Sequence, residues 1–273
     1  MLEPICNSEK LLFSTVRIVA SGESKGTGFF FTFKINGGFV PTIITNKHVI
    51  NENEEETVTF FLHIKDSEES LEIAFKPKWL FHDRHDLCLC FVNPLFEEIK
   101  KRNGKEIMYS QLNEDIIWNK TKLQDLGAIE DVVMVGYPIG LWDEKNNMPL
   151  FRKGITASHP ALDFNGESIG VVDMACFPGS SGSPIFVLNE NGYSHKKGNS
   201  YIGATRFVFL GILYQGPQFN SAGDLIIEDV PTQLKIRPIV PQMINIGYYI
   251  KASEILAFSL DIKKLLPKKI SDN

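Results

Sequence analysis

The sequence is poor in cysteine, in tryptophan and in long apolar runs. It contains only 4 Cys and 3 Trp in 273 residues. Four cysteines are too few for a disulfide scaffold of this size. No apolar run reaches the roughly 18 residues that a membrane-spanning helix needs. We therefore expect neither a disulfide-rich module nor a membrane protein.

The sequence also has no excess of positive charge. The chain has 28 basic and 33 acidic residues, which gives a formal net charge of −5. This balance does not predict a nucleic-acid-binding surface. The lysine pairs at 263–264 and 268–269 are expected to form a solvated tail and not a membrane anchor.

The first ten residues lack the charged and then apolar leader of an exported protein. Cys88 and Cys90 lie two residues apart in a predicted strand, so their side chains share a face but are too far apart to bond comfortably. We expect reduced cysteines in the core, which fits a reducing compartment. The sequence therefore predicts a cytoplasmic protein.

Short strands dominate what the sequence does contain. The strand candidates are apolar or alternating runs bounded by turn residues, at 13–20, 28–35, 39–45, 57–64, 71–75, 87–92, 131–137, 154–158, 169–174, 183–188, 206–214 and 245–250. Asn36-Gly37 predicts a tight hairpin between two of them. A helical pattern is limited to residues 96–102 and 253–265. Many short strands with one terminal helix indicate an all-β protein built from barrels or sandwiches.

Residues 177–184, with the sequence FPGSSGSP, form a candidate nucleophile loop. A serine hydroxyl needs a neighbouring base and a site for the negative charge that develops on the attacked carbonyl. Gly179 and Gly182 allow sharp turns, so the N–H groups of Gly179 and Ser181 can point into one concavity. From these residues alone, an ordinary turn between two strands is the alternative.

His48 is the candidate base among the six histidines, because it follows the apolar strand 41–45 and can be held rigidly at the edge of a core. A carboxylate is then needed to orient the imidazole. Asp86 directly precedes an apolar strand and is the candidate, with Asp83 and Asp66 as less well anchored competitors.

Together these motifs resemble the signature stretches of chymotrypsin-fold serine proteases. The resembling stretches are GTGF at 26–29, TNKHV at 45–49, DLCL at 86–89 and PGSSGSP at 178–184. The order His, Asp, Ser along the chain is also the order of that fold. Three further stretches, at 136–141, 154–158 and 173–179, resemble those of bacterial trypsin-like peptidases of the high-temperature-requirement (HtrA) type.

The resemblance implies a chymotrypsin-like double six-stranded antiparallel β-barrel with a C-terminal helix. We expect the first barrel in residues 11–120, the second in 121–250, and the helix and tail in 251–273. The implied activity is that of a serine endopeptidase without cofactor or metal.

The resemblance also implies a role for each residue of the site. Ser181 attacks the scissile carbonyl, His48 transfers the proton and Asp86 orients the imidazole. The N–H groups of Gly179 and Ser181 form the oxyanion hole.

Three departures from the family pattern bear on regulation and domain content. The residue before the nucleophile is Ser180, where zymogen-activated trypsins have an aspartate. We therefore expect activity without zymogen cleavage, or control by loop ordering, by a regulatory protein or by a second copy of the chain. Only 23 residues follow Ile250, so a PDZ domain like that of HtrA enzymes is not expected. Extra length at 189–203 and 215–244 fits substrate gating, oligomer contact or plain surface decoration equally well.

The resemblance also predicts the walls of the primary specificity pocket. They are Ala175, Leu213, Tyr214, Gln215, Gly216 and Gly247. None of these is charged, so we expect cleavage of a protein or peptide substrate after an uncharged residue. The backbone of residues 214–216 is expected to pair with the substrate as an added strand.

Three alternatives remain at this stage. The protein could be a catalytically silent member of the fold that binds peptides, or an interaction module in which the active-site groove has no role. Finally, His82, Asp83, His85 and Asp86 could be imagined as a metal site.

Overall fold

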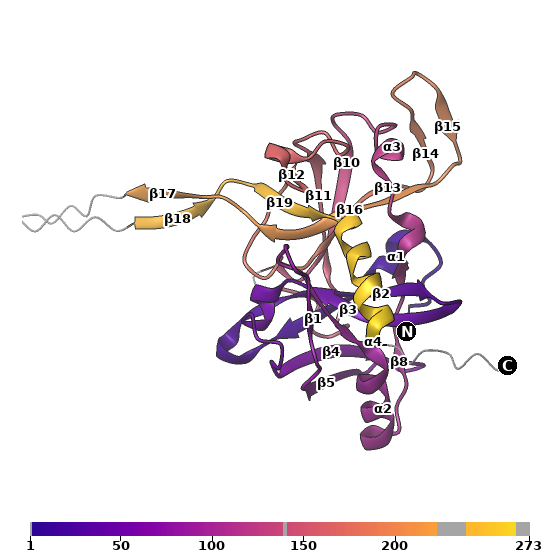
Figure 1. The fold of residues 1–273 in the computed structure, drawn as a ribbon, viewed down its shortest axis with the longest axis vertical. Helices are drawn as coiled ribbons and strands as arrows, with labels where there is room; N and C mark the ends of the chain where they lie inside the picture. Colours follow the sequence, from indigo (N-terminus) through magenta and orange to yellow (C-terminus); the bar gives the residue numbers. More distant parts are fainter. Residues whose placement is uncertain (1, 139–140, 223–238, 266–273) are drawn as a thin grey trace, which may run out of the picture.

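Strands form most of the computed structural model, which describes residues 2–138, 141–222 and 239–265 (Figure 1). Two β-structures lie one above the other in Figure 1, and the C-terminal helix runs from one to the other. The all-β expectation with a terminal helix is confirmed.

The first half of the chain folds into one sheet of nine strands. Its main path runs β5-β4-β1-β2-β3-β7-β6, with β8 added beside β4 and β9 beside β2. The strands are β1 (Thr15–Val19), β2 (Lys25–Ile35), β3 (Gly38–Thr45), β4 (Val58–Ile64), β5 (Ser70–Phe75), β6 (Leu80–Phe81), β7 (Cys88–Phe91), β8 (Ile107–Met108) and β9 (Leu112–Asn113). Asn36 and Gly37 have positive φ angles of 51° and 77°, which confirms the predicted hairpin between β2 and β3.

The second half forms a closed six-stranded barrel in the order β10-β11-β12-β19-β16-β13. Its strands are β10 (Asp131–Gly136), β11 (Leu150–Thr156), β12 (Ile169–Asp173), β13 (Pro184–Asn189), β16 (Arg206–Gln215) and β19 (Ile246–Lys251). Side chains such as Met134, Val172, Ile185 and Leu210 fill its interior. The closed barrel agrees with the expectation for this half. The first sheet differs in detail, because short extra strands join it and its hydrogen-bonded path does not close among the described strands.

Strand β2 is buried on both faces, which explains its continuous apolar sequence. Successive side chains of a strand point to opposite faces. Phe30 therefore packs into the interior of the first sheet, whereas Phe29 and Phe31 belong to the cluster between the halves. The ring of Phe29 meets that of Phe209 from β16 edge-on, with centroids 5.4 Å apart. The two halves are thus joined by a continuous apolar core.

A cation–π contact joins the halves at a second place. The guanidinium of Arg17 on β1 lies 4.5 Å from the ring centroid of Phe61 and 3.8 Å from that of Trp142. Trp142 comes from the connection between β10 and β11, so this connection is fixed against the first sheet.

The helices differ from expectation at their boundaries. Helix α2 (Val92–Asn103) begins four residues earlier than predicted, because Val92 and Leu95 are buried against the first sheet, and it ends at Gly104 with a positive φ of 65°. The C-terminal helix starts as the 3₁₀ segment η6 (Ala252–Ala257) and continues as α4 (Phe258–Leu265). The remaining short helical elements were not predicted: α1 (Asn7–Leu12), α3 (Lys120–Leu123), η1 (Ser21–Glu23), η2 (Lys47–Ile50), η3 (Glu114–Ile116) and η5 (Phe164–Gly166).

Each of the two long insertions contains a hairpin that projects from the body in Figure 1. The first, within 189–203, is β14 (Gly192–Ser194) with β15 (Ser200–Ile202). The second, within 215–244, is β17 (Gln218–Ala222) with β18 (Ile239–Met243). The residues between β17 and β18 lie outside the described residues. The roles expected for both insertions stay predictions.

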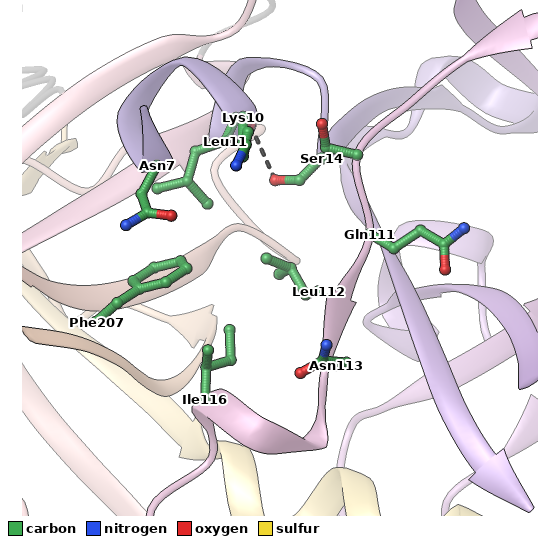
Figure 2. Close-up of a pocket in the computed structure, with 10 residues that line it drawn as sticks. Asn7, Lys10, Leu11, Ser14, Gln111, Leu112, Asn113, Ile116 and Phe207 are labelled. Atoms are coloured by element: carbon green, nitrogen blue, oxygen red, sulfur yellow. Dashed lines mark hydrogen bonds between the residues drawn. The ribbon is translucent and has the colours of Figure 1, made fainter. Parts of the chain in front are cut away.

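Helix α1 rests on the second half, where the Glu190 carboxylate accepts hydrogen bonds from the Ser8 N–H at 3.1 Å and the Ser8 hydroxyl at 2.7 Å. Beside this helix lies a pocket of about 330 Å³ whose walls include Leu112, Ile116 and Phe207 (Figure 2). None of the predicted site residues lines this pocket.

All four cysteines are free, and Cys88 and Cys90 are buried as expected. Burial raises the pKa of both thiols well above the ordinary value. Within the described ranges, no helix has the length and apolarity needed to cross a bilayer.

We expect His63 on β4 to make the fold less stable in acid. Burial lowers its pKa from 6.5 to about 4. Between these pH values the unfolded chain binds a proton that the folded chain does not, so the free energy of unfolding falls as the pH drops. Urea unfolding of His63→Gln should lose about 2 kcal/mol less between pH 7 and pH 4.5 than the wild type does. His195→Gln serves as the control on a projecting hairpin, and an equal acid loss in all three proteins would contradict the prediction.

Candidate active site

His48 and Asp86 form a close pair at neighbouring strand ends of the first sheet. Thr45 at the end of β3 pairs with Cys88 at the start of β7 in antiparallel register. The residues just after β3 therefore lie beside those just before β7. As a result, His48 Nδ1 lies 2.5 Å from Asp86 Oδ2, and the His48 backbone N–H donates to Asp86 Oδ1 at 3.2 Å.

This contact fixes how the imidazole can act. An ionised carboxylate only accepts hydrogen bonds, so this contact favours the neutral tautomer in which Nδ1 carries the proton and Nε2 keeps its lone pair. The His48 side chain is 40% exposed and that of Asp86 is 28% exposed. The imidazole is thus oriented from one side and accessible on the other, as a general base needs to be.

Two part-buried polar contacts hold the chain at Asp86 and just before it. The Asn46 amide donates to the Asp86 carbonyl at 2.6 Å, and the Lys47 ammonium donates to the His82 carbonyl at 2.5 Å. The competitors Asp66 and Asp83 are both exposed. Asp86 is therefore the aspartate that the fold brings to His48.

The neighbouring histidines face a carboxylate of the C-terminal segment. His85 Nε2 lies 3.1 Å from Glu254 Oε2, and His82 Nε2 lies 3.8 Å from the same atom. Burial is the main cause that lowers the pKa of His82, and the nearby His85 adds to it. In the described part of the chain, no three His, Cys, Asp or Glu side chains are grouped to hold a metal ion. The geometry around His82 and His85 thus gives the metal alternative no support.

The candidate nucleophile loop consists of two consecutive turns. The Ser180 N–H donates to the Phe177 carbonyl at 3.0 Å, and the Ser183 N–H donates to the Ser180 carbonyl at 3.0 Å. The third residue of each turn is a glycine with positive φ, 86° at Gly179 and 83° at Gly182. This is the pattern of type II turns, in which that position favours glycine. Ser181 therefore occupies the second position of the second turn.

The second turn is pressed against the first sheet. The Thr27 N–H on β2 donates to the Ser181 carbonyl at 2.9 Å, and the Gly182 N–H donates to the Leu213 carbonyl at 2.8 Å. A Cβ at Gly182 would lie only 1.9 Å from the Thr27 carbonyl oxygen. No side chain fits there, so glycine is required by space as well as by its φ angle.

Among the described residues, neither the Ser181 hydroxyl nor the N–H groups of Gly179 and Ser181 form a hydrogen bond. Both amides therefore remain available to a ligand, as the predicted oxyanion hole requires. The contact between the Ser181 hydroxyl and His48 stays a prediction. Such contacts are often long in unliganded sites.

Ser180, which stands where zymogens have an aspartate, is fully buried, and its hydroxyl has no hydrogen-bond partner in the described part of the chain. A cation contacts the loop at Phe177, the first residue of the first turn. The Arg152 guanidinium on β11 lies 4.7 Å from the ring centroid of Phe177. Sequence reasoning missed this contact, because Arg152 belongs to a distant stretch and carries no motif.

Of the residues predicted to line the specificity pocket, Leu213 and Gly247 lie next to each other. A Cβ at Gly247 would lie 2.8 Å from Leu213 Cδ1 and 2.5 Å from Cys176 Sγ, so these three residues adjoin. Ala175 directly precedes Cys176 and is half-buried. Cys176 was missed, although it is the next residue along. Burial raises the pKa of its thiol to about 11, and the Arg152 charge partly opposes this shift.

Two further residues of the predicted pocket, Tyr214 and Gln215, lie at the end of β16, and the pocket itself stays a prediction. A register irregularity lies between Leu213 and Gln215, and Gln215 is exposed. Tyr214 is half-buried; burial raises its pKa, and repulsion from the ionised forms of the nearby Tyr248 and Asp86 adds to the shift. The second half thus brings Tyr214 into the electrostatic neighbourhood of Asp86 from the first half.

The family model described as a trypsin-like peptidase domain matches residues 26–193, which is more than half of the chain. The chain belongs to the trypsin-like peptidase family. It is therefore a serine endopeptidase, and the matched region contains the His48–Asp86 pair and the two-turn loop. No curated protein sequence matches this trypsin-like peptidase.

Two solved structures illustrate how distant the structural likenesses are. A thermostable serine protease from an extremophilic microorganism has 11% identity and a TM-score of 0.45, covering 93% of this chain and 98% of that one. An inactivated protease paralogue of the scabies mite has 12% identity and a TM-score of 0.44, covering 93% and 96%. Both scores are too low to add to the family match. The closer resemblance to HtrA-type enzymes stays a prediction.

We expect Gly182→Ala to destabilise the protein more than a glycine-to-alanine change at another position with positive φ. The added methyl group would meet the Thr27 carbonyl, so the turn or β2 has to move. Gly198→Ala is the matched control, because Gly198 also has a positive φ, of 90°, but nothing lies within 4 Å of its Cβ position. Backbone strain alone is of order 1–3 kcal/mol. Chemical unfolding should therefore show a loss at Gly182 that exceeds the loss at Gly198 by about 2 kcal/mol or more. Equal losses would mean that the close approach is not rigid.

Proposed function

We propose that this trypsin-like peptidase hydrolyses peptide bonds through an acyl-enzyme formed on Ser181, with His48 as general base and Asp86 as the group that orients it. The single observation that carries the proposal is the 2.5 Å contact between His48 Nδ1 and Asp86 Oδ2. It leaves Nε2 as the acceptor for a hydroxyl proton.

The proposed chemistry follows from these roles. Ser181 Oγ attacks the carbonyl carbon of the scissile peptide while its proton passes to His48 Nε2. The tetrahedral intermediate then collapses, and the leaving amine takes that proton as the C–N bond breaks. Water enters, gives a proton to His48 and hydrolyses the ester, which returns Ser181 to its starting form.

The charge on the former carbonyl oxygen requires donors that are already oriented. The unpaired N–H groups of Gly179 and Ser181 fit this role, since no described residue competes for them. Two type II turns constrain the backbone around both amides. This arrangement favours an active enzyme over the catalytically silent alternative.

We propose that the loop needs no zymogen cleavage to adopt this conformation. Ser180 cannot form the ion pair that a new N-terminus would offer to an aspartate. Instead the loop is held by residues outside it: the Thr27 N–H donates to the Ser181 carbonyl, and the Arg152 guanidinium lies against the Phe177 ring. Control by a partner or by loop ordering would then act on an assembled site.

For specificity we propose an uncharged residue at the cleaved bond. Leu213, Gly247 and Cys176 adjoin, and none bears a charge at neutral pH, since the Cys176 thiol has its pKa raised to about 11. A small or apolar substrate side chain can enter such a site without losing hydration that nothing replaces. The backbone of residues 214–216 would pair with the substrate as an added strand.

The triad is tested by three substitutions. Ser181→Ala should lower kcat on a casein-like substrate by about four orders of magnitude or more, and Asp86→Asn should lower it by a comparable factor through loss of the correct tautomer. Asp83→Asn is the matched control on the same loop and should retain full activity.

A fluorophosphonate probe makes the same test independent of substrate choice. It should label the wild-type protein at Ser181 and should not label Ser181→Ala. A folded wild-type protein that neither cleaves nor reacts would refute the proposed mechanism and favour a peptide-binding pseudoprotease.

The specificity proposal is tested with a peptide library. We expect cleavage after small or apolar residues, with Arg, Lys and Glu depleted. Gly247→Ala places a Cβ 2.8 Å from Leu213 Cδ1 and 2.5 Å from Cys176 Sγ, so these side chains have to move, and the preference should shift towards the smallest substrate side chains. A profile dominated by Arg, Lys or Glu would overturn the proposal while leaving the triad intact.

A further inference from the structure

Thr27 links the first sheet to the candidate oxyanion loop through its side chain as well as its backbone. The residue lies on β2 and is 0% exposed. Its N–H donates to the Ser181 carbonyl at 2.9 Å. Its hydroxyl lies 3.3 Å from the Gly179 carbonyl oxygen and donates to it. One residue of the first half therefore binds the loop on both sides of Ser180.

The hydroxyl is also fixed in its own orientation. The Tyr137 N–H, which follows β10, donates to Thr27 Oγ1 at 3.1 Å. Because this contact uses a lone pair of Oγ1, the hydroxyl proton is directed towards the Gly179 carbonyl. The Thr27 carbonyl in turn accepts from the Thr45 hydroxyl at 2.7 Å, three residues before His48. Thr27 thus joins the histidine segment, the barrel and the loop.

The peptide group between Gly179 and Ser180 shows why this hydroxyl matters. Its N–H side is held by the Phe177 carbonyl at 3.0 Å, and its carbonyl side is held by Thr27 Oγ1. The two peptide groups on either side of it carry the N–H groups of Gly179 and Ser181. A glycine can adopt several backbone conformations, so without the hydroxyl nothing in Gly179 itself selects this one.

We propose that the Thr27 hydroxyl is a positioning residue for catalysis: it fixes the Gly179–Ser180 peptide so that the flanking N–H groups point at the developing oxyanion. This inference rests on the proposed function of the Ser181 loop. It assigns to the side chain of the GTGF stretch a part in stabilising the transition state. Binding of the substrate in the ground state should need it much less.

The test compares Thr27→Val with Thr27→Ser. Valine keeps the shape of threonine but removes the hydroxyl, whereas serine keeps the hydroxyl and removes only a methyl group. We expect Thr27→Val to lower kcat about tenfold or more with KM changed by less than about twofold. Thr27→Ser should restore kcat to within about threefold of the wild type.

Thr42→Val is the matched control for loss of a buried threonine hydroxyl. Thr42 is also 0% exposed, and its hydroxyl donates to the Phe31 carbonyl at 2.8 Å, but among the described residues no hydrogen bond joins its side chain to the loop. Thr42→Val should lower the melting temperature and leave kcat unchanged. A second readout is the affinity for a peptide boronate, which places an anionic oxygen in the hole. It should weaken in Thr27→Val together with kcat, while affinity for the product peptide stays the same.

Each outcome decides the inference. Wild-type kcat in folded Thr27→Val, or a change confined to KM, overturns it. So does a fall in kcat that Thr27→Ser fails to reverse. If Thr27→Val does not fold, Thr27→Cys replaces it under the same criteria, because a thiol is a poor donor. A wild-type protein that does not react with fluorophosphonate refutes the proposed function, whereas a reactive wild type with fully active Thr27→Val refutes only this inference.

Discussion

The backbone of the 180–183 turn lies so close to the backbone of β2 that no side chain fits at Gly182. At this place a hydrogen bond runs from Thr27 in the first sheet to Ser181 in the second half. The position of the candidate nucleophile relative to the first half is therefore set by direct contact between the two backbones. The phenylalanine-rich core beside it, with Phe29 packed against Phe209, holds the two halves in this arrangement. The loop geometry thus depends on a rigid junction between the halves.

The order of the motifs allowed much of this to be predicted from the sequence. Turn chemistry is local, so Asn36-Gly37 and the two glycines of the 177–184 stretch could be assigned to tight turns, and the structure gives all four a positive φ. The pairing of His48 with Asp86 could be anticipated because each residue adjoins an apolar strand. Antiparallel pairing of β3 and β7 then brings those strand ends together.

Other contacts join parts of the chain that are far apart in sequence, and no local sequence pattern predicts them. Arg152 meets Phe177, and Glu254 meets His85, only because strands and helices far apart in sequence are packed together. Cys176 was missed because its approach to Gly247 joins two segments about 70 residues apart in the sequence. The first half was expected as six strands, but two-residue strands such as β8 and β9 are too short to give a periodic signal.

The contact between Glu254 and His85 has a consequence for how the protein is made. Glu254 belongs to the segment after the last barrel strand, yet it pins the loop that carries Asp86 in the first half. Phe258 and Ile262 of α4 also fill the core between the halves. A chain still being translated can build its first sheet early, but it cannot complete this arrangement until residues 254–262 have left the ribosome. The contacts that hold the Asp86 loop are therefore completed only late in synthesis, after all the barrel strands have been made.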